Sequence, residues 1–111
     1  METIKIKDIT NSHLAVSSID GDKVFDIIDI SFKADKKVEL DFEGIELTIT
    51  AFLNSSIGKL YSIYNVEKIK SLLTIINLKQ DEVVLLKLVI EKAKERFGKD
   101  FLNDNDLVDE V

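Results

Sequence analysis

The sequence predicts a single α/β domain with a mixed central β-sheet and helices packed on it. Its 111 residues, 45% hydrophobic and 32% charged, suffice for one globular domain with its own core. Segments in which apolar and polar residues alternate, as in half-buried strands, are interspersed with segments whose apolar residues recur at helical spacing. Strands followed by helices along the chain indicate helices layered on one sheet.

The first twenty residues are expected to form two short strands. In residues 3–9 isoleucines alternate with polar residues, and residues 14–16 are apolar. Asn11 and Ser12 between these segments favour a turn. We therefore predict that the two strands pair as a hairpin at one edge of the sheet.

Residues 20–32 are expected to form a helix. Val24, Ile27 and Ile28 lie at helical spacing, and the acidic residues early in the segment suit a helix N-terminus. The lysine-rich residues 33–37 then end it.

Residues 38–60 hold the segment around which we expect the domain to be organised. Val38, Leu40 and Phe42 alternate with acidic residues as in a strand, and Gly44 breaks this strand. A second alternating segment follows, after which apolar residues return at helical spacing. The predicted order is strand, turn, short extended segment and helix.

The C-terminal half is expected to contribute a buried strand and a long helix. Residues 71–78 are a nearly continuous apolar run, typical of a strand in the interior of a sheet. In residues 81–97 a wide apolar stripe predicts a helix, with Gly98 as its natural end. We therefore interpret residues 1–98 as the domain and residues 99–111 as an acidic tail, either a solvated end or a docking segment.

Composition argues against several classes of function. The chain has no cysteine for disulfides or thiolate chemistry, and its single histidine cannot form a conventional zinc cluster, so no metal or other cofactor is expected. A net charge of −6 and a pI of about 4.7 disfavour nucleic acids and anionic membranes as partners. The N-terminal residues lack the apolar run of a signal peptide or membrane span, which predicts a cytoplasmic protein.

The order of three motifs resembles that of a known family. VELDFEGI at residues 38–45 is followed by Phe52, then by IIN at residues 75–77, and later by a helix ending in KAKERF. This combination resembles the STAS-like domains of unknown function, distant relatives of the anti-sigma-factor-antagonist (STAS) fold. The resemblance covers most of the chain, from the second strand through the last helix.

The resemblance implies a central strand that leads through a loop into a helix whose start is the recognition surface. In the anti-sigma antagonists this helix start carries a serine, usually in an Asp-Ser-Ser-Gly run, which a partner ATPase of the histidine-kinase type phosphorylates. Ungapped alignment of LDFEGIELTIT places Thr50 at the phosphorylated position and Ile49 at that of the aspartate. Asn54 and Ser55 also stand where relatives commonly have Asp-Glu. The resemblance therefore implies a recognition surface that has diverged.

We expect a non-enzymatic regulatory domain that binds a partner protein, with a histidine-kinase-type ATPase as the partner that the resemblance implies. The alternative is a structural or assembly subunit, a homodimer or complex component, that uses a sheet edge, the final helix or the tail. The expected binding surface is the strand-to-helix corner at residues 48–56. The side chains expected to bind or switch there are Thr48, Thr50, Phe52, Asn54, Ser55 and Ser56.

Two hypotheses remain for Thr50. A threonine at a helix start commonly caps the helix by accepting a hydrogen bond from a backbone amide, and this is the hypothesis that we favour. Phosphorylation of the Thr50 hydroxyl is the second, and the two roles are compatible.

Other polar residues have a structural and a functional interpretation. Asp41, Glu43 and Glu46 gather near a strand end and offer the best route to a cation site or acid–base chemistry, although solvated or hydrogen-bonded carboxylates are more common. His13 is interpreted as structural or exposed, and Asn77 as a turn residue.

Overall fold

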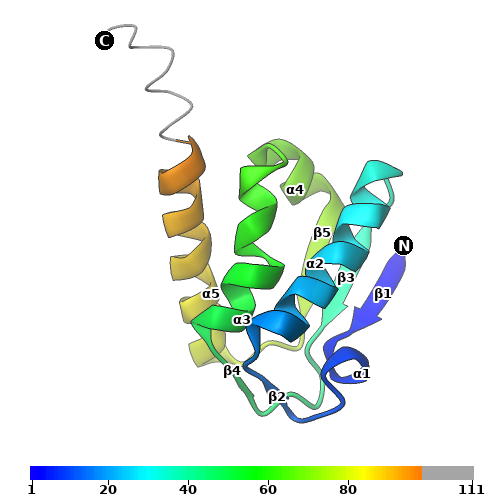
Figure 1. Ribbon diagram of the computed structural model, residues 1–111, viewed down its shortest axis with the longest axis vertical. Helices are drawn as coiled ribbons and strands as arrows, with labels where there is room; N and C mark the ends of the chain where they lie inside the picture. Colours follow the sequence, from blue (N-terminus) through cyan, green and yellow to red (C-terminus); the bar gives the residue numbers. More distant parts are fainter. Residues whose placement is uncertain (99–111) are drawn as a thin grey trace, which may run out of the picture.

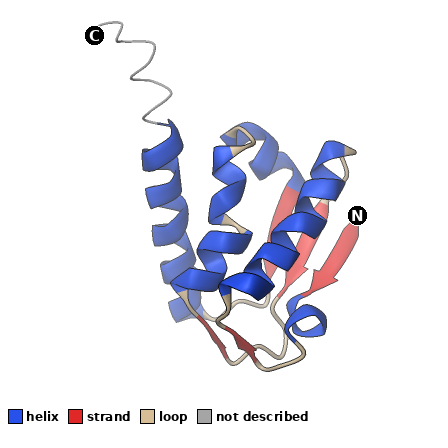
Figure 2. Cartoon of the chain, viewed as in Figure 1, coloured by secondary structure: helices blue, strands red, loops and turns tan. Residues whose placement is uncertain are grey.

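The computed structural model describes residues 1–98 and has its helices layered on one side of a three-stranded sheet (Figures 1 and 2). The predicted α/β class is confirmed. The tail predicted for residues 99–111 lies outside the described residues. The sheet is formed by β1 (Glu2–Lys5), β3 (Val38–Asp41) and β5 (Leu73–Ile76).

The strand order is β1-β3-β5, and both pairings are parallel. Ile4, Leu40 and Ile75 therefore lie side by side in one row. We expected a mixed sheet, with the apolar run at residues 71–78 in its interior. Instead β3 is central and β5 is a half-buried edge strand. The apolar run indicated burial, but it carried no information about which strands lie beside it.

The two faces of the sheet differ. Ile4, Val38 and Leu40 point into the core and are buried, whereas Thr3 and Lys5 on the opposite face are exposed. Parallel sheets are commonly covered on both faces, so a polar open face is unusual for this pairing. Side chains on the open face bind one another, for example through the Thr3 hydroxyl, which donates to a Glu39 carboxylate oxygen at 3.2 Å.

The N-terminal hairpin prediction is wrong. Only the beginning of the segment predicted as a strand is extended, because the chain turns into α1 (Ile6–Thr10), which ends at Asn11 in a left-handed conformation with φ 53°. The next strand, β2 (Leu14–Ala15), pairs in parallel with β4 (Leu47–Thr48) to form a separate two-stranded sheet. Helix α1 redirects the chain, and β3 occupies the position beside β1.

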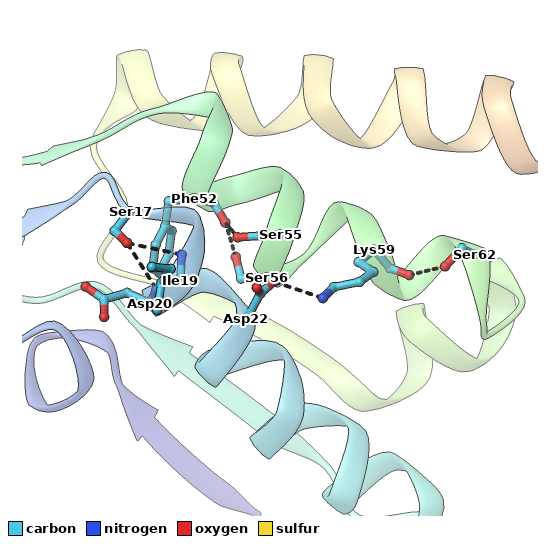
Figure 3. Close-up of polar contacts among 9 residues, drawn as sticks. All are labelled: Ser17, Ile19, Asp20, Asp22, Phe52, Ser55, Ser56, Lys59 and Ser62. Atoms are coloured by element: carbon cyan, nitrogen blue, oxygen red, sulfur yellow. Dashed lines mark hydrogen bonds and ion pairs between the residues drawn. The ribbon is translucent and has the colours of Figure 1, made fainter.

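The helix predicted at residues 20–32 is confirmed as α2 (Ser18–Lys33). Ser17 caps it, since its hydroxyl oxygen accepts from the backbone amides of Ile19 and Asp20 at 3.1 and 3.3 Å (Figure 3). A serine at this position satisfies amides that have no partner within the helix.

The segment after β4 contains three short helical elements. The predicted helix after the corner is α3 (Thr50–Ser56), and the 3₁₀ turn η1 (Gly58–Ser62) continues it. A separate helix, α4 (Val66–Leu72), leads into β5. The side chain of Asn65 caps α4 by accepting from the amide of Lys68 at 2.8 Å.

The helix predicted at residues 81–97 is α5 (Gln80–Ala93), followed directly by the π turn η2 (Lys94–Gly98). The last helical turn ends at Gly98, where the sequence predicts a stop. In Figure 1, α5 forms the outer edge of the helical layer, beside α3 and far from β1.

The core lies between the sheet and the helical layer. Helix α2 makes its most extensive contact with α3. Phe42 after β3 meets Phe52 of α3 edge-to-face, with 6.4 Å between ring centroids, and Phe32 of α2 meets Tyr64 in the same way at 5.2 Å. Each such pair contributes about 0.5–1.5 kcal/mol beyond the burial of its area.

Candidate functional site

The strand-to-helix corner begins at Thr48, which is buried and held by two hydrogen bonds. Its hydroxyl donates to the carbonyl oxygen of Ala15 at 2.9 Å, and its amide donates to a carboxylate oxygen of Glu82 at 3.0 Å. These bonds join β4 to β2 and to the first turn of α5. Thr48 therefore holds the corner in place. We expected its side chain to contact a partner, but this side chain is buried.

Phe52 and Ser56 also face inward. The Phe52 side chain is fully buried in the core, and the Ser56 hydroxyl donates to the Phe52 carbonyl oxygen at 2.7 Å (Figure 3). Residues four apart share one face of a helix, and on α3 this is the core face. Neither side chain is accessible to a partner, which corrects our expectation for both.

Thr50 does not cap α3. It is the first residue of the helix, and the capping position belongs to Ile49, which has no side chain that can accept a hydrogen bond. The capping hypothesis is therefore wrong. The Thr50 side chain is exposed, and its hydroxyl makes no hydrogen bond to any residue in the described part of the chain.

The remaining two corner residues, both on α3, differ in their exposure. Asn54 is exposed. Ser55 is half-buried against α2, and its hydroxyl donates to the Phe52 carbonyl oxygen at 3.3 Å. Of the six side chains predicted for the site, those that reach the surface are thus Thr50, Asn54 and, in part, Ser55.

An exposed apolar patch precedes α3. Leu14 and Leu47 are paired neighbours on β2 and β4, and their side chains are 46% and 47% exposed. Ile49 is 38% exposed and, two residues after Leu47 in extended backbone, it lies on the same face. We call Leu14, Leu47 and Ile49 the apolar corner. The sequence did not reveal this patch. Alternation of apolar and polar residues indicates a strand whose two faces differ, and we expected the apolar face to be buried.

A cavity of about 490 Å³ lies on another flank of α3. Small residues form much of its wall: Ser18, Ala51, Ser55, Gly58 and Ala93. The longer side chains around it are Asn54, Lys59, Lys92 and Arg96. We call this cavity the basic pocket. It shares no residue with the apolar corner, although both adjoin the start of α3.

The acidic residues near the end of β3 do not form a ligand set. Asp41 is buried, and its carboxylate accepts from the Asn77 side-chain amide at 2.8 Å and from the Glu43 backbone amide at 2.9 Å. These bonds, that from Asn77 first, lower the pKa of Asp41. Glu43 and Glu46 are exposed. Within residues 1–98 no three acidic or histidine side chains lie close enough together to hold a metal ion.

His13 and Asn77 support loops. The His13 Nδ1 atom lies 3.2 Å from the Gly44 carbonyl oxygen, and the His13 carbonyl accepts from the Glu46 amide at 2.7 Å. Asn77 adopts a left-handed backbone with φ 61°, and its side chain bonds Asp41. The interpretation of Asn77 as a turn residue is confirmed.

Two polar interactions, one buried and one part-buried, were not predicted. Glu82 in α5 bonds the Thr48 amide, and Asp29 in α2 accepts a hydrogen bond from the Tyr64 hydroxyl. The bond from Tyr64 lowers the pKa of Asp29, while burial and the Asp29 carboxylate raise the pKa of Tyr64 to about 12. In the sequence these acids look like ordinary polar positions of amphipathic helices, so no local pattern marks them.

A protein-family model matches the central part of the chain. The model of the family described as "STAS-like domain of unknown function (DUF4325)" matches residues 20–83, more than half of the chain. The chain belongs to this family. The match runs from α2 to the first turn of α5 and includes β3 and the corner, so the predicted resemblance is confirmed.

Comparisons with curated proteins and with solved structures returned no match for this STAS-like domain. Among residues 1–98, no helix combines the length and the hydrophobicity that crossing a membrane requires.

Proposed function

We propose that this STAS-like domain is a non-enzymatic regulatory module that binds a partner protein through the apolar corner. The supporting observation is the exposure of three adjoining apolar side chains, Leu14, Leu47 and Ile49, on a ribbon that leads directly into α3. Isolated exposed apolar residues are ordinary, whereas adjoining ones commonly mark interaction sites.

The backbone under the apolar corner is held in place. Thr48 lies between Leu47 and Ile49, and it is tied to Ala15 and Glu82 by the two hydrogen bonds described above. A surface fixed in its binding conformation loses little conformational entropy on association. This rigidity supports recognition of a partner by a preformed surface.

Thr50 is the residue we propose as a switch for this contact. Its exposed hydroxyl follows Ile49 directly. Phosphorylation would place about two negative charges beside the apolar corner and would disfavour the docking of an apolar partner surface. A histidine-kinase-type ATPase is the partner class that the relation to the anti-sigma-factor antagonists suggests, and it would act both as partner and as modifying enzyme.

A double variant tests the apolar corner with little risk to the fold. Leu47→Thr keeps a residue suited to strands, and Ile49→Ser places a good capping residue at the start of α3. We expect the folded double variant to lose the partners that the wild type captures from cells expressing the protein, with affinity for a purified partner at least about tenfold weaker.

Ile30 provides the matched control, because its side chain on α2 is also apolar and exposed. Ile30→Ser is expected to capture the same partners as the wild type. Equal capture by the wild type and the Leu47→Thr, Ile49→Ser variant would contradict the proposal. A partner of the kinase class would in addition phosphorylate the wild type and leave Thr50→Val unmodified, as measured by intact mass.

A second candidate function is assembly through the sheet edge. Within residues 1–98, β5 pairs with β3 alone, and its four residues are uncharged. Such an edge can pair with another strand, and two copies joined there would extend the sheet. Sedimentation would separate the candidates, because Thr74→Lys on β5 would dissociate an edge-paired dimer and leave binding at the apolar corner unchanged.

A further inference from the structure

The basic pocket has a chemical character unlike that of the protein as a whole. The chain carries a net charge of −6, yet Lys59, Lys92 and Arg96 line this cavity, and none of its lining residues within residues 1–98 is acidic. Lys92 and Arg96 lie on the continuous helical segment α5–η2, and the tertiary fold brings Lys59 of η1 to the same cavity.

Small side chains explain why the space is open. Ala51 and Ser55 of α3, Gly58 of η1 and Ala93 of α5 leave a volume of about 490 Å³ between these elements. Cavities of about 300–1,000 Å³ suit small molecules.

Lys59 is held in position at the pocket. Its ammonium group lies 2.9 Å from an Asp22 carboxylate oxygen (Figure 3) and 4.4 Å from the centre of the Phe25 ring. These contacts from α2 reduce the conformational freedom that the lysine would lose on binding a ligand.

Lys92 and Arg96 lie four residues apart on the helical segment opposite. Like charges at this spacing disfavour a helix by a few tenths of a kcal/mol, although cations near a helix C-terminus are favourable. The helix C-terminus does not account for the third cation, Lys59, which comes from another element.

Neutral donors complete the set. Ser18 and Asn54, which carry a hydroxyl and an amide, also line the cavity, whereas the hydroxyl of Ser55 donates to the Phe52 carbonyl oxygen. A phosphate group offers several oxygens and up to two negative charges, so it can accept hydrogen bonds from cations and neutral donors together. Within residues 1–98 no aromatic side chain lines the pocket, so the described residues offer no ring on which a nucleobase could stack.

We propose that the basic pocket binds a small molecule that carries phosphate groups. Its phosphates contact Lys59, Lys92 and Arg96, and its uncharged part rests on the small side chains of the wall. This site is separate from the apolar corner, so the inference does not depend on the proposed partner binding.

Titration of the full chain with pyrophosphate, followed by amide NMR at constant ionic strength, tests this assignment. We expect saturable shifts centred on Ser18, Asn54 and Lys92. Lys92→Glu is expected to weaken pyrophosphate binding at least about tenfold. Ala51→Leu fills the pocket from an exposed position of α3 without a change of charge, and it should weaken binding to a similar extent.

Lys87→Glu is the matched control, because Lys87 lies on the same helix, is exposed and is not part of the pocket. It should leave the affinity within about twofold of the wild type, since screened surface charges act weakly at a distance. Equal losses in the two lysine variants, or shifts that do not saturate, would overturn the proposal. Citrate binding as tightly as pyrophosphate would overturn the preference for phosphate.

Discussion

Gly21 of α2 lies so close to Ser55 of α3 that a Cβ atom at residue 21 would sit 1.8 Å from the Ser55 hydroxyl oxygen. The same atom would lie 2.8 Å from the carbonyl oxygen of Phe52, which belongs to the backbone of α3. Gly21 is buried inside a helix, where glycine is intrinsically unfavourable. Its presence allows the two helices beneath the candidate site to pack at short distance.

Gly21→Ala is expected to destabilise the domain, although alanine is the better helix former. Separating the helices should lower the free energy of unfolding by about 1–3 kcal/mol, as overpacking of cores commonly does. Urea denaturation measures this change. Adding Ser55→Ala should restore only part of the loss, because the Phe52 carbonyl remains in the way.

Gly58→Ala serves as the comparison for this prediction. A Cβ atom there would meet its nearest neighbours at 3.1 and 3.4 Å, tight contacts that small adjustments can relieve. Its loss should be clearly smaller than that of Gly21→Ala. If Gly21→Ala matched the wild type or exceeded it in stability, the close helix contact would be refuted.

The two threonines of the corner should respond differently to the same substitution. Thr48→Val removes the buried bond to the Ala15 carbonyl, and we expect a loss of about 1–2 kcal/mol in the free energy of unfolding. Thr50→Val changes an exposed side chain and should stay within about 0.5 kcal/mol of the wild type. Thermal or urea unfolding measures both, and equal effects would contradict the burial of Thr48.

Asn77→Gly tests the bond between Asn77 and Asp41. Glycine accepts the left-handed backbone at residue 77, so the substitution removes the amide donor without imposing strain. We expect a loss of about 1.5–3 kcal/mol near neutral pH, typical of a hydrogen bond to a charged group. Asp41→Asn provides the second arm, and in that background Asn77→Gly should cost less.

The effect of Asn77→Gly should depend on pH. The pKa of Asp41 is lowered in the folded state, so its stabilising contribution is complete above the unfolded pKa of 3.8 and is lost as the pH falls through the folded value. The difference in unfolding free energy between wild type and variant should therefore shrink on acidification. A difference that stays constant down to about pH 2 would show that the Asp41 carboxylate is not involved.

Local patterns predicted several elements correctly. The periodicity of residues 20–32 and 81–97 located α2 and α5, and the alternation after Val38 located β3. Each of these patterns reports the average environment of neighbouring positions. Strand pairing leaves no such local pattern. For this reason we predicted a hairpin where the structure has parallel pairs, β1 with β3 and β2 with β4.

The strand-to-helix corner was predicted in position, but the orientation of its side chains was not. The corner after β4 was located correctly, yet Thr48 and Phe52 face inward while Leu47 and Ile49 face outward. In a short segment that passes from strand to helix, one residue of register decides which side chains are exposed. That register is set by contacts with Ala15 and Glu82, which lie far away in the sequence.

The sequence by itself determined the α/β class, the main helices and the STAS-like family, because these depend on the spacing of apolar residues and on short motifs. Only the tertiary structure decided that the sheet is parallel, that Leu14 lies beside Leu47, and that Lys59 lines the same pocket as Lys92. These features depend on contacts between distant residues. Such contacts are selected by the packing of the whole core, which no local pattern records.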